Sequence, residues 1–192
     1  MPKAAGRIRA SALQLASDLS LAALIGGNLF GRYAMAPALA EISDPRERGK
    51  VLNCAWRRYG AVNALASIGL LASWIPIRRR ELAGVRLSTR EAALLAARDL
   101  ATAGVLASGL AAAVGGVRFA QEAPEGAVPM QDGQMTSPEA SRSAARTKTL
   151  MNALGGLNLG FELALAAINA ARLEQRARTL HRSRPSLRSL LR

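Results

Sequence analysis

The chain is poor in the residues that build most catalytic and metal sites. Its 192 residues include one cysteine, Cys54, and one histidine, His181. A single cysteine excludes a disulfide within the chain, and a single histidine in a basic tail speaks against haem ligation or a histidine-rich metal site. We therefore expect no metal and no cofactor, and the sequence identifies no catalytic residue.

Aromatic residues are also scarce, at 4% of the chain, although half of all residues are apolar. Alanine, leucine and glycine supply most of that apolar half. A water-soluble core of this size normally buries large aromatic side chains, whereas small residues suit helices that pack closely in lipid. The composition therefore favours an all-α membrane protein.

Acidic residues are half as frequent as basic ones, 13 against 26, which gives a net charge of +13. The cations flank apolar stretches and are not interleaved with aromatic residues, and no motif for binding DNA or RNA is visible. We expect no nucleic-acid partner. The excess of cations instead predicts contact with the lipid bilayer, and with anionic lipid at the basic tail, at about 1 kcal/mol per cation near the surface.

Four long stretches with few charges predict four transmembrane helices, because about 20 apolar residues are needed to cross the hydrocarbon core. The clearest of them runs without charge from Tyr59 to Ile77 and ends before three consecutive arginines. We place the spans at about residues 13–40, 52–77, 92–118 and 147–171. They predict an all-α, four-span, up-and-down transmembrane helix bundle over residues 11–171, between a basic arm (1–10) and a basic tail (172–192).

The first stretch has an alternative interpretation as a secretory signal. It has a positively charged start, an apolar middle and a small-residue cleavage site at residues 38–40. A leader of that length containing Asp18 and Arg32 is too long and too charged for a typical signal, so a transmembrane helix is favoured.

The distribution of cations predicts the orientation in the membrane. Sixteen Lys and Arg residues lie in segments 1–10, 78–98 and 172–192, and nine lie in the two connections on the opposite side. By the positive-inside rule both termini are then cytoplasmic. The abundance of alanine and arginine is typical of GC-rich bacterial genomes, which points to a bacterial cytoplasmic (inner) membrane. Segment 121–143 is acidic, contains proline and glycine, and predicts a solvated, flexible outer loop.

Polar residues inside the spans are the best candidates for a functional site. At about 1.5 Å of rise per residue, Asn28, Asn63, Asn158 and Glu162 fall in the central layer of the membrane. Asn158 and Glu162 are four residues apart and share a helix face. A carboxyl group at this depth is costly, and such a residue is by default functional or paired inside the bundle. These four residues form a hypothetical ligand or ion site.

Three structural alternatives stay open for Glu162. The first is an uncharged carboxyl group that hydrogen-bonds Asn158 or Asn63 and links two helices. The second is an ion pair with Arg57 or Arg58 reaching inwards. The third is a side chain that faces lipid where the bilayer is thin.

Two further carboxylates lie in the first turns of helices. Asp18 and Asp99 complement the helix dipole at these positions, and they lie within reach of interfacial cations such as Arg98. We interpret both as structural.

Small residues one helical turn apart predict close helix contacts, because they let backbones approach. They are Gly27 with Gly31, Gly104 with Ser108, and Gly156 with Gly160. The leading functional hypothesis is therefore a non-enzymatic membrane protein that assembles with itself or with another membrane protein through these faces. The alternative is a small transporter or permease component that uses Glu162 and the asparagine layer.

A motif at the end of the first span resembles a known group of proteins. The segment Asn28-Leu-Phe-Gly-Arg-Tyr-Ala-Met-Ala-Pro-Ala-Leu closes a Gly-rich first helix and is followed by three more spans. It looks like small four-helix bacterial membrane proteins of unknown function and is similar to the anthrone-oxygenase-like group. The resemblance implies a membrane oxygenase-like enzyme as a third alternative, although no catalytic residue of that group can be placed on this sequence.

Overall fold

A computed structural model describes the backbone of residues 2–83 and 88–182, with side chains for residues 11–83 and 88–175. Within these residues the chain is helical and has no strand, which confirms the all-α prediction. The elements are α1 (Pro2–Phe30), the π-helical η1 (Gly31–Met35), α2 (Ala36–Ala38), the 3-10 turn η2 (Leu39–Glu41), α3 (Pro45–Leu82), α4 (Thr89–Ala120), the 3-10 turn η3 (Pro124–Gly126) and α5 (Arg142–Arg182).

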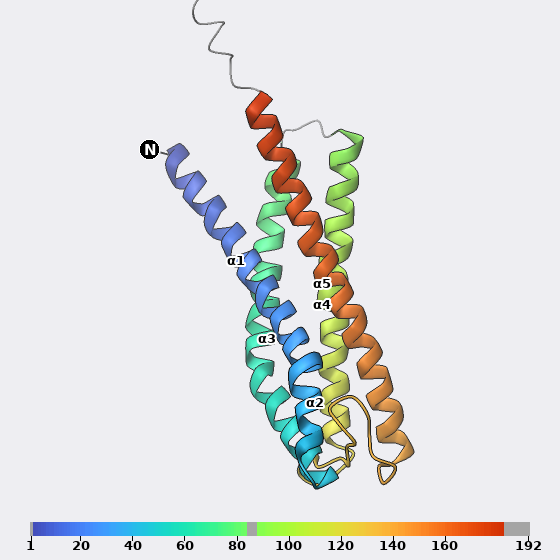
Figure 1. The fold of residues 1–192 in the computed structure, drawn as a ribbon. Coiled ribbons are helices and arrows are strands. Elements are labelled where there is room, and N and C mark those ends of the chain that lie inside the picture. The colour runs from blue at the N-terminus through green and yellow to red at the C-terminus, as the bar shows by residue number, and fades with distance from the viewer. Residues whose placement is uncertain (1, 84–87, 183–192) are drawn as a thin grey trace, which may run out of the picture.

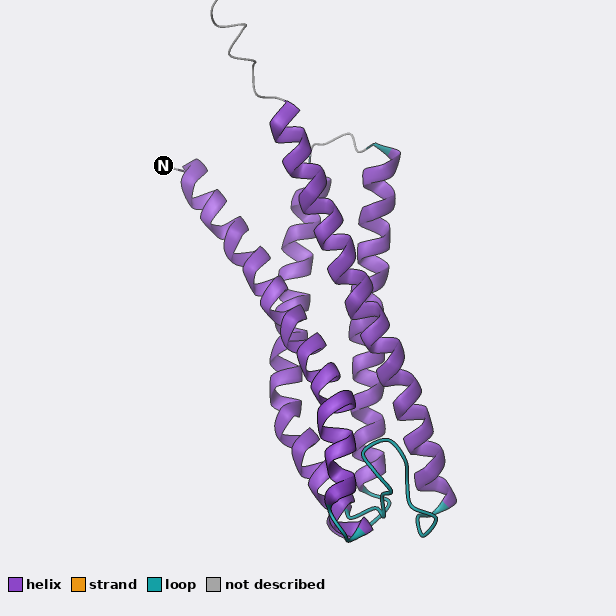
Figure 2. Cartoon of the chain, in the orientation of Figure 1, coloured by secondary structure: helices purple, strands orange, loops and turns teal. Residues whose placement is uncertain are grey.

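The four long helices run alternately up and down, so α1 begins and α5 ends at the same end of the bundle (Figure 1). α1 packs mainly on α3, and α4 packs mainly on α5. The bundle therefore consists of two antiparallel pairs. The short turn between η2 and α3 and the long α4–α5 connection lie together at the opposite end, called here the loop end (Figure 2).

Four helical segments of the described chain are long and apolar enough to cross a membrane: Ser11–Glu41, Pro45–Leu82, Thr89–Ala120 and Arg142–Gln175. Each contains a span predicted from the sequence. Only 22% of the most apolar window of each segment is buried inside the bundle, and large side chains such as Leu65 and Leu100 are 71% and 70% exposed. So much apolar surface is costly in water and is matched by lipid tails, as expected for a four-span bundle.

Local signals set the starts of the two central helices. Asp44 caps α3 by accepting a hydrogen bond from the backbone N–H of Arg46, and Pro45 occupies the first turn, where it loses no helical bond. Ser88 and Glu91 form a capping box at the start of α4. These caps place the turns where the sequence predicted the chain to reverse.

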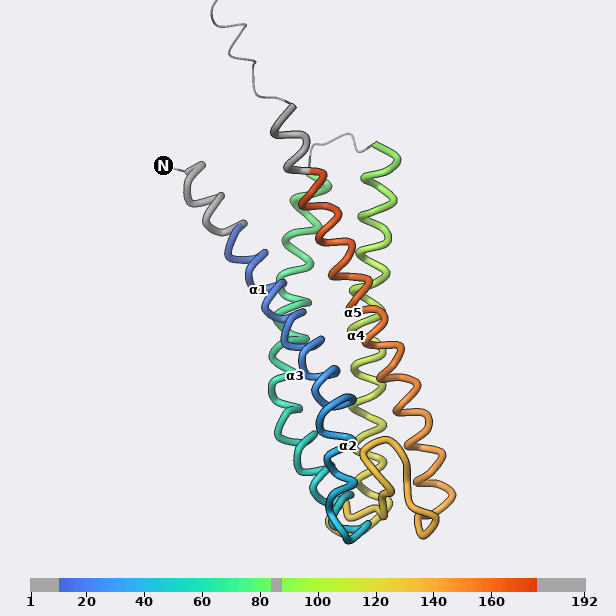
Figure 3. Tube along the Cα trace, in the orientation of Figure 1, coloured from blue at the N-terminus to red at the C-terminus, as the bar shows by residue number. Residues whose placement is uncertain are grey.

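Pro37 does not end the first helical segment, which continues to Glu41 (Figure 3). A proline inside an α-helix clashes with the carbonyl group four residues earlier. The chain widens into the π-helical η1 just before this point, and Ala36 N–H bonds the carbonyl oxygen of Gly31, five residues earlier. The wider turn accommodates Pro37.

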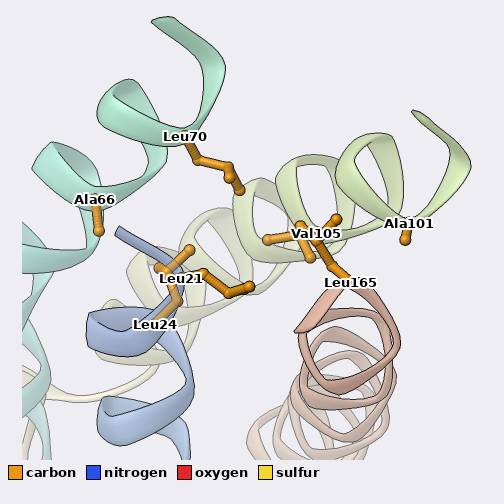
Figure 4. Packing of buried hydrophobic residues seen from close by; sticks show 7 residues of the cluster. All are labelled: Leu21, Leu24, Ala66, Leu70, Ala101, Val105 and Leu165. Carbon is orange, nitrogen blue, oxygen red and sulfur yellow. The ribbon is translucent and has the colours of Figure 1, made fainter. Parts of the chain in front are cut away.

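The apolar core lies at mid-height, where side chains from all four long helices meet (Figure 4). Leucine and valine fill the centre, and alanine on α3 and α4 keeps the helices close. The buried members are Leu21, Leu24, Ala66, Leu70, Ala101, Val105 and Leu165.

The long α4–α5 connection packs against the loop end of the bundle instead of standing free in solvent. Val128 is 1% exposed and Met130 is fully buried, in a cluster with Leu39, Leu52 and Phe119. The prediction of a solvated loop is therefore wrong for these residues. Segment 121–143 lacks helical or strand periodicity because its apolar residues fill one end of the bundle rather than one face of an element.

Arginine and glycine hold this connection in place. The Arg48 side chain donates to the carbonyl oxygens of Ala40, Ile42, Met130 and Gln131. A Cβ atom at Gly49 would lie 1.9 Å from the carbonyl oxygen of Val128, and one at Gly133 would lie 2.3 Å from the Cα of Ala36. Two backbone approaches of this kind require glycine.

The side chains of residues 1–10 and 176–192 lie outside the described part of the chain. The basic arm, most of the basic tail and His181 fall there. Contact of the tail with anionic lipid therefore stays a prediction.

Candidate functional site

A chain of hydrogen bonds joins the two helix pairs where α1 meets α5. The Asn28 amide nitrogen donates to Oδ1 of Asn158 at 2.9 Å and to Oε1 of Glu162 at 2.8 Å. The Asn158 amide nitrogen donates in turn to the carbonyl oxygen of Val105, at 2.8 Å, and to Oγ of Ser108, at 3.0 Å. Polar groups of α1, α4 and α5 are thus linked inside the bundle.

Glu162 lies at the centre of this group. Its side chain is fully buried, and no described residue hydrogen-bonds its second carboxyl oxygen, Oε2. At about 1.5 Å per residue, Glu162 lies about 15 Å along α5 from Arg172 and about 21 Å from Lys148. These cations border the apolar part of α5, so the carboxyl group lies deep between the two faces of the span.

The geometry contradicts two of the three structural alternatives for Glu162, and the donor to its carboxyl group is Asn28 rather than Asn158 or Asn63. Complete burial contradicts a lipid-facing side chain, and Arg57 and Arg58 are exposed rather than paired with it. Asn28 contacts both Asn158 and Glu162, so the expected layer forms with Asn28 as the link. Asn63 stays outside the hydrogen-bonded group, because no described residue bonds its side chain.

A second polar contact between α5 and the first helical segment lies closer to the loop end. The Arg32 guanidinium donates to the carbonyl oxygen of Asn152 at 3.2 Å, and the Asn152 amide donates to the carbonyl oxygen of Gln134 at 2.7 Å. Lys148 is 7% exposed, with its Nζ 5.7 Å from the centre of the Phe119 ring. Polar residues therefore line the contact of η1 and α5 from the α4–α5 connection towards Glu162. The only signal in the sequence was Arg32 itself, a cation inside an apolar stretch.

Charged residues also join the helices at the end where α1 begins. Glu81 of α3 pairs with Arg98 of α4, which is 3% exposed, and with Arg172 of α5. Asp99 pairs with Arg78 and accepts a hydrogen bond from the Trp74 indole. The sequence suggested that Asp99 pairs with Arg98. That suggestion is wrong, because Asp99 pairs with Arg78 and Arg98 pairs with Glu81.

The other carboxylate near that end makes a local contact. Asp18 is exposed and accepts a hydrogen bond from Gln14 on its own helix. It has no part in the contacts between helices.

Three of the predicted glycines contact aromatic rings rather than neighbouring backbones. A Cβ at Gly27 would lie 2.2 Å from the Tyr59 ring, and one at Gly31 would lie 2.5 Å from Trp56. A Cβ at Gly104 would lie 2.6 Å from the ring of Phe161, so the contacts of these three glycines lie within one chain. On α5, a Cβ at Gly156 would lie 3.6 Å from the Arg32 guanidinium and one at Gly160 would meet no atom within 4 Å.

The chemistry available to the group around Glu162 is that of one carboxyl with amide and hydroxyl neighbours. Such a group takes up or releases a proton, or holds a small cation through its oxygens. Within the described chain, no three His, Cys, Asp or Glu residues lie close enough to hold a metal ion. Comparison with protein-family models, curated proteins and solved structures gave no match.

Proposed function

We propose that this protein is a small transporter or permease component of a bacterial cytoplasmic membrane, in which Glu162 takes up a proton or a small cationic solute. One observation carries the proposal: the Glu162 carboxyl is fully buried between the helices, and Oε2 has no hydrogen-bond partner among the described residues. An unsatisfied polar group inside a membrane protein costs several kcal/mol. Ionisable residues kept at such a cost mark ion and substrate pathways.

The neighbours of Glu162 suit an exchangeable carboxyl group. Asn28 binds it through a neutral amide, and no arginine or lysine forms a described ion pair with it. A fixed cation would hold the group permanently as a carboxylate, because an opposite charge favours the ionised form. A neutral amide leaves it free to alternate between two states.

Assembly through Gly-rich faces receives less support. Gly27, Gly31 and Gly104 seat aromatic rings of the same chain, so these positions are already occupied. Gly160 faces open space and is the position that a second copy would use. The oxygenase-like alternative still has no residue to which a catalytic role can be given.

The cation distribution supports both termini facing the cytoplasm. In this orientation the loop end lies outside, and the ion pairs around Glu81 lie at the cytoplasmic side.

Ion flux into proteoliposomes tests the proposal. Purified protein is reconstituted with an entrapped pH dye or sodium dye, and proton or sodium entry is driven by an imposed potential. Wild type should conduct one of the two ions faster than protein-free vesicles, and Glu162→Gln should fall to the protein-free rate. Asp18→Asn removes an exposed carboxylate of the same membrane domain and serves as the matched control, with wild-type flux. Equal flux in wild type and Glu162→Gln, or none in either, contradicts the proposal.

A further inference from the structure

An apolar groove runs along the outside of the bundle between α1–η1 and α3. It has a volume of about 450 Å³, within the range of pockets that hold small ligands. One charged side chain, Arg58, lines it. Its apolar walls include Gly26, Phe30, Trp56, Tyr59 and Val62.

Arg58 lies part-way along the groove, between Trp56 on its loop-end side and Val62 on the other. Arg58 directly precedes the charge-free section 59–77, so its guanidinium lies at the headgroup level of the leaflet at the loop end. Val62 lies one turn further into the span. The side chain of Arg58 is exposed and has no ion-pair partner among the described residues.

The small side chains of the groove walls leave room for an extended apolar chain. Gly26 lines the groove, and a Cβ there would meet no atom within 4 Å. Gly27 and Gly31 let the Tyr59 and Trp56 rings lie flush against the first helix, and the Tyr59 hydroxyl is satisfied by the carbonyl oxygen of Ala23, at 2.7 Å. The groove thus offers apolar contact without an unsatisfied hydroxyl.

We propose that this groove binds one anionic phospholipid from the leaflet at the loop end. An acyl chain lies against Gly26, Phe30 and Val62, and the Arg58 guanidinium binds the phosphate. Charge complementarity selects an anionic headgroup, because guanidinium donates paired hydrogen bonds to phosphate oxygens. The site is separate from Glu162 and does not depend on the proposed transport.

Quenching of Trp56 fluorescence by brominated lipid tests the site. Trp74→Phe leaves Trp56 as the chain's single tryptophan; if that variant does not fold, the difference between wild type and Trp56→Phe gives the same signal. The full-length protein is reconstituted in phosphatidylcholine vesicles that contain an equal, minor fraction of brominated phosphatidylglycerol or brominated phosphatidylcholine. Phosphatidylglycerol should be preferred about fivefold at the Trp56 site, the ratio given by one cation near an anionic lipid.

Three variants separate the groove from general lipid contact. Arg58→Gln should abolish the preference while leaving quenching by brominated phosphatidylcholine unchanged. Arg57→Gln, the matched control, removes an adjacent exposed cation that does not line the groove and should keep the preference. Gly26→Leu fills the groove and should reduce quenching by both lipids.

Two results overturn the proposal. Equal quenching by the two brominated lipids in wild type shows only the ordinary lipid boundary. Protection of Trp56 from both lipids, lost as the protein is diluted in lipid, shows that a second copy covers the groove instead.

Discussion

The Asn28 amide nitrogen lies 2.8 Å from Oε1 of Glu162, although 134 residues separate them in the chain. This hydrogen bond connects the α1–α3 pair to the α4–α5 pair inside the bundle. It also leaves Oε2 of Glu162 without a described partner. Oε1 of Glu162 therefore links the two helix pairs, whereas Oε2 makes no hydrogen bond with the described residues.

The first prediction separates these two contributions. Glu162→Gln keeps an acceptor for Asn28 and should melt close to wild type in detergent. Glu162→Leu removes the acceptor and should lose a hydrogen bond worth about 0.6 to 2 kcal/mol in membranes. Thermal melting of both purified variants measures the difference. Strong destabilisation by glutamine would mean that the carboxylate is charged and paired, and wild-type melting of both would leave Glu162 with a functional role alone.

The second prediction concerns glycines that differ in their surroundings. Gly104→Ala places a Cβ 2.6 Å from the Phe161 ring and should destabilise the bundle by about 1–3 kcal/mol, the usual cost of overpacking. Gly160→Ala on α5 meets no atom within 4 Å and should be tolerated. Melting temperatures of the two variants test this, and a larger loss for Gly160→Ala would instead place that glycine in a contact between copies.

The third prediction concerns Glu81. Glu81→Gln removes the ion pair between Glu81 and the buried Arg98 and should cost about 3–5 kcal/mol, as when one member of a buried ion pair is removed. The control is Glu125→Gln, because Glu125 pairs with Lys50 at the exposed surface. The Lys50 hydrogen bond lowers the pKa of Glu125, so any contribution of this exposed pair is present at neutral pH and is lost as the pH falls. Similar melting of Glu81→Gln and wild type would contradict the role given to Glu81.

The fourth prediction fixes the orientation. In a variant without Cys54, cysteine introduced at Met135, which is 51% exposed at the loop end, should react with an impermeant reagent added outside intact cells. Cysteine introduced at Arg90, at the opposite end of the bundle, should react only after the membrane is opened. Labelling of both positions from the same side would contradict the four-span arrangement, and an exchange of sides would reverse the orientation.

The spans could be predicted because they depend on composition along a single helix. The charge-free run 59–77 and the cations that border it mark one helix without knowledge of its neighbours. The α4–α5 connection was misjudged because burial of Val128 and Met130 depends on distant helices. No periodic pattern within the connection records that contact.

The candidate site was predicted in part for the same reason. Asn158 and Glu162 share a helix face, which follows from their spacing alone. The choice of Asn28 over Asn63 as partner depends on how the two helix pairs meet, which no local pattern encodes. The pairing of Glu81 with Arg98 was missed because it depends on how α3, α4 and α5 meet at that end of the bundle.

Infrared difference spectroscopy of the reconstituted protein most directly tests whether Glu162 exchanges a proton. Spectra are compared between acidic and alkaline buffer for wild type and Glu162→Gln, with Asp18→Asn as the control. The proposed function predicts a band of a protonated, buried carboxyl group that appears in acid, disappears in alkali, is absent from Glu162→Gln and is unchanged in Asp18→Asn. A difference spectrum that Glu162→Gln leaves unaltered would show that this carboxyl never changes its protonation, and would contradict a carrier role for Glu162.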